Sequence, residues 1–171
     1  MSPFTGAAKL IALVVCSGAA VLGSTANSAG SPSGTLMRTL PRGYDSTNCQ
    51  EVTPPDGMLE KVTCNQNSDP AGPGSAIFWL LPNKDGLAGA FQGAGNKMTV
   101  APSCPGGQAS PGSWHYDSSP DQSAGQVECG TINSGGTTVS MVVWTDYTKM
   151  RAALIGGTDI ASLYKWWGSV P

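Results

Sequence analysis

The chain has 171 residues and a formal net charge of −2 at neutral pH. Its nine lysines and arginines are scattered singly, so no basic stripe supports binding to nucleic acid. The same scatter excludes a polybasic segment of the kind that holds proteins on anionic membranes. Only 12% of the residues are charged, and glycine and proline are frequent, which favours short strands joined by turns.

Residues 1–29 have the features of a signal peptide. Lys9 precedes an apolar run over residues 10–22, and small residues between 23 and 30 offer A-x-A-like cleavage sites. The apolar run is shorter than the ~20 residues that a membrane-spanning helix needs. We therefore expect cleavage of this segment and no stable insertion into a membrane.

Cys16 raises the alternative of a lipid anchor. Val15 stands where a lipobox usually has glycine or alanine, and the cysteine lies within the apolar run rather than after it. We therefore predict a secreted protein, located outside the cell or in the cell wall after signal-peptide cleavage.

The mature chain is expected to begin with a flexible lead-in over residues 30–35, followed by a single domain over residues 36–171. Alternation and apolar runs predict strands at 58–64, 76–81, 98–100, 113–117, 125–145 (two strands) and 150–155. Apolar residues at helical spacing predict one helix around 87–91, with Asp85 as a candidate N-cap. A second helix is predicted at 160–167, capped by Thr158 or Asp159.

Two stretches of the chain share one pattern, in which a strand ends in cysteine and a following apolar strand ends in tryptophan. The matching positions are Val62, Cys64, Ser75, Ile77 and Trp79 in the first stretch, and Val127, Cys129, Ser140, Val142 and Trp144 in the second. Each stretch precedes one of the expected helices. We therefore predict an α+β fold, with an antiparallel sheet from two related strand–strand–helix halves and the helices packed on one face.

Four cysteines remain once the signal peptide is removed: Cys49, Cys64, Cys104 and Cys129. In an exported chain they predict two disulfides, and three pairings are open. Pairing of nearest neighbours would give one bridge to each half. Zinc is disfavoured because no C-x-x-C pair is present and His115 is the only histidine, so we expect no metal and no cofactor.

Two patterns could carry hydrolytic chemistry. Ser113, His115 and Asp117 alternate along one expected strand, although neighbours two residues apart rarely form a triad and no G-x-S-x-G motif is present. We interpret them as a polar strand face. Carboxylate pairs for glycoside cleavage could be drawn from four residues: Asp117, Asp121, Glu128 and Asp146. Nothing in the sequence singles out one pair among them.

The aromatic residues suggest a core and a candidate binding surface. Trp79 and Trp144 are expected in the core. Consecutive residues lie about 100° apart on a helix, so of the final pair of tryptophans Trp166 is expected to be partly exposed. Together with Trp114 and Tyr116, it could line a groove for a sugar, a lipid or a peptide.

The order of these motifs resembles that of a known group of exported domains. The residues that carry the resemblance are Leu40, Pro41, Gly43, Tyr44, Cys49, Cys64, Cys104-Pro-Gly106, Trp114, Gly125, Cys129, Trp144-Thr-Asp146 and Leu163-Tyr-Lys-Trp-Trp167. In this order the chain resembles small exported actinobacterial proteins of the mycobacterial type, and the extracytoplasmic C-terminal domain of some actinobacterial serine/threonine protein kinases.

This resemblance covers residues 36–167 and implies a fold and an extracytoplasmic location. In the kinases such a domain is regarded as a sensor, and the resemblance supplies no catalytic residues. No kinase domain and no transmembrane helix precede the matching region here, so we expect no signalling in cis.

These observations predict a secreted, non-enzymatic binding or sensor-like module. Its partner would be an envelope ligand, such as a wall fragment or a lipid, or another exported protein. The alternative is a small cell-envelope hydrolase that uses His115, which a His115→Ala variant would distinguish. A third interpretation is a partner subunit of a membrane sensor.

Overall fold

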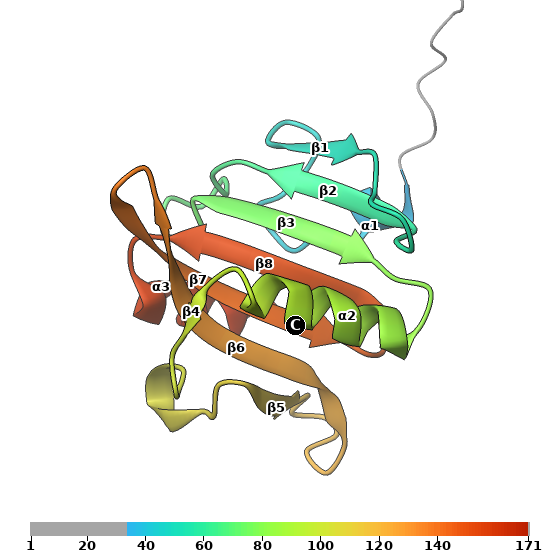
Figure 1. Cartoon of the computed structure of the whole chain (residues 1–171). Helices are drawn as coiled ribbons and strands as arrows, with labels where there is room; N and C mark the ends of the chain where they lie inside the picture. Colours follow the sequence, from blue (N-terminus) through green and yellow to red (C-terminus); the bar gives the residue numbers. More distant parts are fainter. Residues whose placement is uncertain (1–33, 171) are drawn as a thin grey trace, which may run out of the picture. The chain divides into compact units, whose positions relative to one another are not determined.

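The computed structural model describes residues 34–170 (Figure 1). The predicted signal peptide over 1–29, Cys16 and all but the end of the predicted lead-in over 30–35 lie outside the described residues. The strands are β1 (Cys49–Val52), β2 (Glu60–Cys64), β3 (Ser75–Leu80), β4 (Thr99–Val100), β5 (Gly112–His115), β6 (Ser123–Ser134), β7 (Thr137–Asp146) and β8 (Arg151–Gly157). The helices are α1 (Thr35–Arg38), α2 (Lys84–Gly95), the 3₁₀ turn η1 (Pro105–Gly107) and α3 (Ile160–Trp167).

All strands belong to one antiparallel sheet in the order β1-β2-β3-β8-β7-β6-β4. β5 also pairs with β6, so β4 and β5 occupy successive parts of the same edge of that strand. β8 therefore lies in the middle of the sheet, between strands from the first and second parts of the chain (Figure 1).

The longest hairpin, β6–β7, closes through a turn that the sequence dictates. Ser134 pairs with Thr137, and the two residues between them, Gly135 and Gly136, have φ values of 58° and 82°. Positive φ at both positions defines a type I′ turn, whose twist matches that of the strands, and glycine adopts it without strain.

Both disulfides join nearest neighbours in the sequence. Cys49 and Cys64 lie opposite each other on β1 and β2, and their bridge ties the edge strand to the sheet. Cys104 and Cys129 join the loop before η1 to the middle of β6. The structure thus selects nearest-neighbour pairing among the three that the sequence left open.

The sheet is covered on both faces, and the two longer helices lie on opposite sides of it (Figure 1). Leu163 and Trp167 of α3 pack in the main core with Phe78 and Trp144. Leu87 of α2 packs with residues of the other face in a separate cluster. The prediction that both helices pack on one face is wrong, because β7 and β8 carry buried apolar residues on both of their faces.

The predicted division into two related halves is not confirmed, because the two strand pairs have different registers. Val127 lies opposite Trp144 across β6 and β7. In the first pair Val62 lies opposite Phe78, and Trp79 lies opposite Lys61. A shift of one residue moves a side chain to the other face of a sheet, so Trp79 and Trp144 point in opposite directions.

The helix ends show which capping predictions hold. Asp159 caps α3, as predicted, by accepting a hydrogen bond from the backbone nitrogen of Ser162 at 2.8 Å. α2 is longer than predicted, and its N-cap is Asn83, which accepts from the nitrogen of Gly86 at 2.9 Å. Asp85 instead lies in the first turn of α2, where its charge favours the helix dipole.

Candidate binding groove

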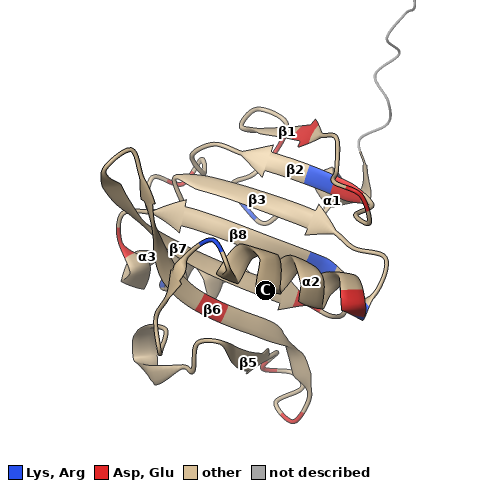
Figure 2. Cartoon of the chain, viewed as in Figure 1, with Lys and Arg blue, Asp and Glu red and all other residues tan. Residues whose placement is uncertain are grey.

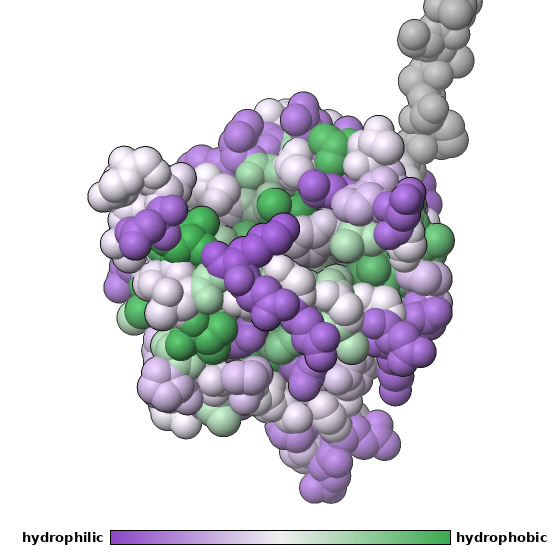
Figure 3. All heavy atoms as spheres, in the orientation of Figure 1, coloured by the Kyte–Doolittle hydropathy of each residue, from purple (hydrophilic) through white to green (hydrophobic). Residues whose placement is uncertain are grey.

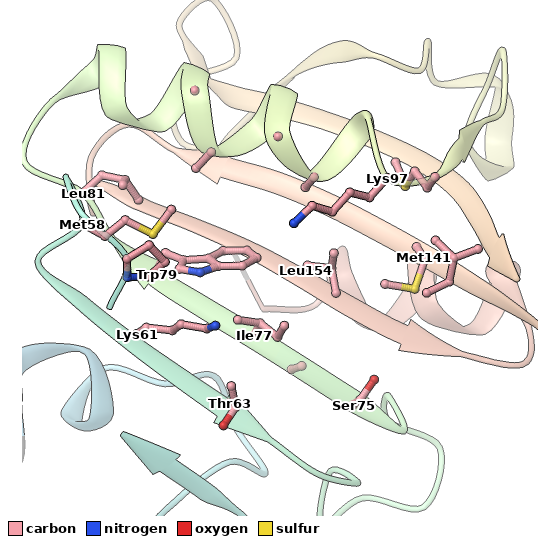
Figure 4. Close-up of a pocket in the computed structure, with 18 of the residues that line it drawn as sticks. Met58, Lys61, Thr63, Ser75, Ile77, Trp79, Leu81, Lys97, Met141 and Leu154 are labelled. Carbon is pink, nitrogen blue, oxygen red and sulfur yellow. The ribbon is translucent and has the colours of Figure 1, made fainter. Parts of the chain in front are cut away.

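A groove with a volume of about 950 Å³ lies between α2 and the sheet. Figure 3 shows this face hollowed beside the hydrophilic surface of α2, and Figure 4 shows the side chains that line the hollow. The volume falls at the upper end of the range of 300–1,000 Å³ that is usual for small-molecule sites. The groove is the candidate functional site of the protein.

The floor of the groove consists of side chains that alternate along neighbouring strands and share one face of the sheet. They are Lys61 and Thr63 from β2, Ile77 and Trp79 from β3, Leu154 from β8 and Met141 from β7. Met58 and Leu81 close one end (Figure 4). Ile77, Trp79 and Leu154 are only half-buried, so the floor presents apolar surface to an occupant.

The wall that faces this floor is α2, and the groove exists because that side of α2 carries small residues. They recur at helical spacing: Gly86, Gly89, Ala90, Gly93 and Ala94. A Cβ atom added at Gly89 or Gly93 would have no atom within 4 Å. The helix is held in place by Leu87 and Phe91, which are buried against the sheet. Large residues thus anchor α2, while small residues leave the space beside it open.

Three ionisable residues line the groove: Lys61, Lys97 and Asp56. Lys61 extends from the floor and Lys97 from the chain just after α2, and both amino groups point into the groove with the indole of Trp79 between them in this view (Figure 4). Within residues 34–170, neither lysine takes part in an ion pair, the one such pair being Lys149–Asp146. β3, in the middle of the floor, has no charged residue (Figure 2). The two ammonium groups are therefore available to an occupant.

A buried acid lies under the C-terminal end of α2, next to the groove. Glu128 of β6 is 4% exposed, and its Oε1 has no hydrogen-bond partner. A Cβ atom at Gly95 would lie 2.6 Å from that oxygen, so the helix backbone passes directly over the carboxyl group. Burial raises the pKa of Glu128 to about 7. The carboxyl group therefore changes its charge near neutral pH.

Two of the three aromatic residues that the sequence nominated for binding lie together on the opposite face. The rings of Trp114 and Tyr116 are 4.9 Å apart. Trp114 is 5% exposed and donates a hydrogen bond from Nε1 to the backbone oxygen of Thr145 at 2.8 Å. Tyr116 donates from its hydroxyl to Asp146 Oδ2 at 2.6 Å. These contacts are those of core residues.

Trp166, the third nominated residue, packs elsewhere. Its ring lies 5.8 Å from that of Tyr44, and it is half-buried, as the sequence predicts. The residue that reaches Trp114 is Trp167, with ring centroids 5.8 Å apart. A ligand-binding role for Trp114, Tyr116 and Trp166 stays a prediction.

The residues nominated for hydrolysis are spread over the structure. Ser113 and His115 are exposed on β5, where a bulge between Trp114 and His115 interrupts the alternation, and Asp117 follows the strand. His115 Nδ1 lies 3.2 Å from the backbone oxygen of Gln122. In the part of the chain that the structure describes, no hydrogen bond joins the three nominated side chains. A hydrolase that uses His115 stays a prediction.

The four candidate carboxylates also lie apart. Asp117 and Asp121 are exposed in the loop between β5 and β6. Glu128 lies on the α2 face, whereas Asp146 points to the α3 face, where it accepts from Tyr116 and from the backbone nitrogens of Thr148 and Lys149. Glu128 and Asp146 are separated by the sheet and therefore cannot flank one glycosidic bond.

Residues 34–170 contain no group of three or more His, Cys, Asp or Glu side chains that could hold a metal ion. Within the same residues, no helix combines the length and the apolar character that crossing a bilayer requires. In comparisons with known proteins, no family model, no curated protein and no solved structure matches this chain.

The groove is not among the sites predicted from the sequence, because the pattern of the residues that form it is that of structural residues. The sequence predicts that Trp79 lies in the core, as Trp144 does. The available signal was the spacing of small residues along α2, together with the lysine that alternates with apolar residues on β2. That spacing indicates a helix with one face left empty.

Proposed function

We propose that this protein is an extracytoplasmic binding module that holds an elongated apolar molecule in the groove between α2 and the sheet. The observation that carries the proposal is the apolar floor around Trp79, left open by the small residues of α2. When hydrocarbon replaces water in an apolar groove, the free energy falls by about 25 cal/mol per Å² of apolar surface buried. A half-buried tryptophan in the floor supplies a large, rigid contact surface.

The proposed location outside the cytoplasm has two supports. Residues 34–170 hold two disulfides, and such bonds persist in oxidising compartments. The sequence of residues 1–29 is typical of a signal peptide. In this interpretation the module carries or senses its ligand in the cell envelope or outside the cell, and no chemical step is assigned to it.

The test is the binding of Nile red, an uncharged apolar dye whose emission shifts to the blue in an apolar site. Gly89 and Gly93 face the open groove, so Gly89→Leu and Gly93→Leu should fill it with side chains. Both changes also raise helix propensity, so α2 should still form. We expect the wild-type protein to shift the dye emission and the double variant to lose this effect.

Gln92→Leu is the matched control, because it adds the same side chain to the exposed side of the same helix. This control should bind the dye as the wild type does. Equal binding by the Gly89→Leu/Gly93→Leu protein, with circular dichroism and unfolding temperature unimpaired, would show that the dye binds elsewhere and would refute the proposal.

A further inference from the structure

The groove has a charge pattern that its apolar floor does not explain. Lys61 enters it from the floor, on β2, and Lys97 enters it from the chain after α2 (Figure 4). Lys61 alternates on its strand with Val62, which is fully buried on the other face, so its side chain is directed to the groove by the pleat of the sheet. Neither ammonium group has an acidic partner within residues 34–170.

We infer that the occupant of the groove is a long-chain fatty acid, whose carboxylate lies between the ammonium groups of Lys61 and Lys97 and whose chain lies on the apolar floor. The inference rests on the proposed function and names its ligand class. Charge complementarity selects an anion: half-buried Lys61 and exposed Lys97 have no acidic partner within residues 34–170, and a molecule without charge would gain no charge-assisted hydrogen bond from them.

The charge of the head group follows from the third ionisable residue of the lining. Asp56 lies in the loop before β2, at the end of the groove formed by Met58. Two ammonium groups and one carboxylate leave a formal charge of +1, which a single carboxylate neutralises. A phosphate monoester carries between one and two negative charges at neutral pH and would leave an excess of negative charge.

The position of Asp56 also sets the direction of the chain. An anionic head near the Met58 end would face a like charge, which is unfavourable. The chain therefore runs from the two lysines along Leu154 towards Met141 and Ile132, which line the other end of the groove. These three side chains are apolar, and Asn133 and Ser134, which follow Ile132 in the lining, carry no charge.

The experiment compares dodecanoate with dodecan-1-ol, which has the same chain and an uncharged head, as displacers of Nile red at pH 8 and low ionic strength. We expect the acid to bind about tenfold more tightly than the alcohol, the effect of charge-assisted hydrogen bonds. Lys61→Gln/Lys97→Gln should lower the affinity for the acid about tenfold relative to that for the alcohol, and so remove this preference. Lys84→Gln is the control, because Lys84 lies on α2 outside the groove, over the ring of Tyr147.

The outcomes separate the two proposals. If acid and alcohol bind equally to the wild type, or if the double lysine variant keeps the preference for the acid, the fatty-acid inference fails and the groove remains a binding site. If dodecyl phosphate binds more tightly than dodecanoate, the choice of a singly charged head is wrong. The Gly89→Leu/Gly93→Leu variant shows whether the dye binds in the groove. If it abolishes dye binding but neither dodecanoate nor dodecan-1-ol displaces the dye from the wild type, the fatty-acid inference is refuted. If the dye still binds to that variant, the proposed function itself is refuted.

Discussion

Trp114 donates a hydrogen bond from its indole nitrogen to the backbone oxygen of Thr145, and the two meet across Gly125. A Cβ atom at Gly125 would collide with that oxygen and would lie 2.6 Å from the indole nitrogen. The absence of a side chain at this position is therefore what allows a buried tryptophan to satisfy its donor on β7. The contact also fixes β5 against the end of the sheet.

The first prediction is that Gly125→Ala destabilises the protein by more than about 3 kcal/mol, because it overpacks the core and breaks a buried hydrogen bond. Urea unfolding monitored by tryptophan fluorescence measures the change. Gly93→Ala is the matched control, since its Cβ meets no atom within 4 Å and it lies within a helix. This control should gain about 0.5–1 kcal/mol. A Gly125→Ala protein as stable as the control would contradict the assigned contact.

The second prediction concerns the two tryptophans that the sequence treats alike. Trp144 is fully buried, so Trp144→Ala should cost about 3–5 kcal/mol of unfolding free energy. Trp79 is half-buried in the groove floor, so Trp79→Ala should cost less stability but should weaken the binding of Nile red. Denaturation and dye titration of both variants test this division. Equal losses of stability would show that Trp79 is a core residue after all.

The third prediction is a pH dependence that originates in Glu128. Its pKa is about 7 in the folded protein and near 4.5 in the unfolded chain, so the folded state binds the extra proton between these values. Stability should therefore fall as the pH rises from about 4.5 to 7, by up to about 3 kcal/mol, and this contribution should then level off. Unfolding free energies measured across this range should show the fall.

Glu128→Gln removes this titration, and the stability of the variant relative to the wild type should increase with pH over the same interval. His115→Gln provides the control, because it removes the only imidazole of the chain. The carboxylates of Asp45 and Asp159 act in a lower range, since hydrogen bonds lower the pKa of each and their contribution is lost only in acid. A Glu128→Gln protein with the same pH profile as the wild type would show that the carboxyl group is solvated.

The fourth prediction compares the disulfides. The bridges join cysteines 15 and 25 residues apart, and loop entropy alone assigns them about 3 and 3.5 kcal/mol. Cys129 is fully buried in the main core, whereas the Cys49–Cys64 bridge ties down an edge strand. We expect Cys104→Ala/Cys129→Ala to lose more stability than Cys49→Ala/Cys64→Ala, as measured by thermal unfolding. The reverse order would mean that the edge strand matters more than the core.

The sequence predicted most of the elements because their signals are local. The two disulfides, though not their pairing, the capped helix at 160–167, and the strands that contain Phe78 and Val142 follow from composition and period. β1 is not among the predicted strands, because a four-residue edge strand with two exposed polar residues has no apolar alternation to reveal it. Such an edge segment becomes a strand because it pairs with its neighbour, and its own residue pattern does not predict this.

The site could not be predicted, because it depends on register and on the path of the chain. The motifs around Trp79 and Trp144 are alike, yet a shift of one residue in the pairing of β2 and β3 turns Trp79 to the opposite face. Which residue pairs with which is decided by the loops and by the strands on either side. The groove then forms where Trp79 meets the side of α2 that carries glycine and alanine.

The central position of β8 has a consequence for how the chain folds. Ile77 of β3 pairs with Leu154 of β8, residues far apart in the sequence, so the sheet becomes continuous only after a late segment inserts between two earlier ones. Contacts of such long sequence separation slow folding, and until they form, β3 and β7 present open edges on which other chains can add. Each disulfide, by contrast, lies within one of the two earlier parts and can form first. The bridges thus secure two separate pieces, and the arrival of β8 unites them and completes the floor of the groove.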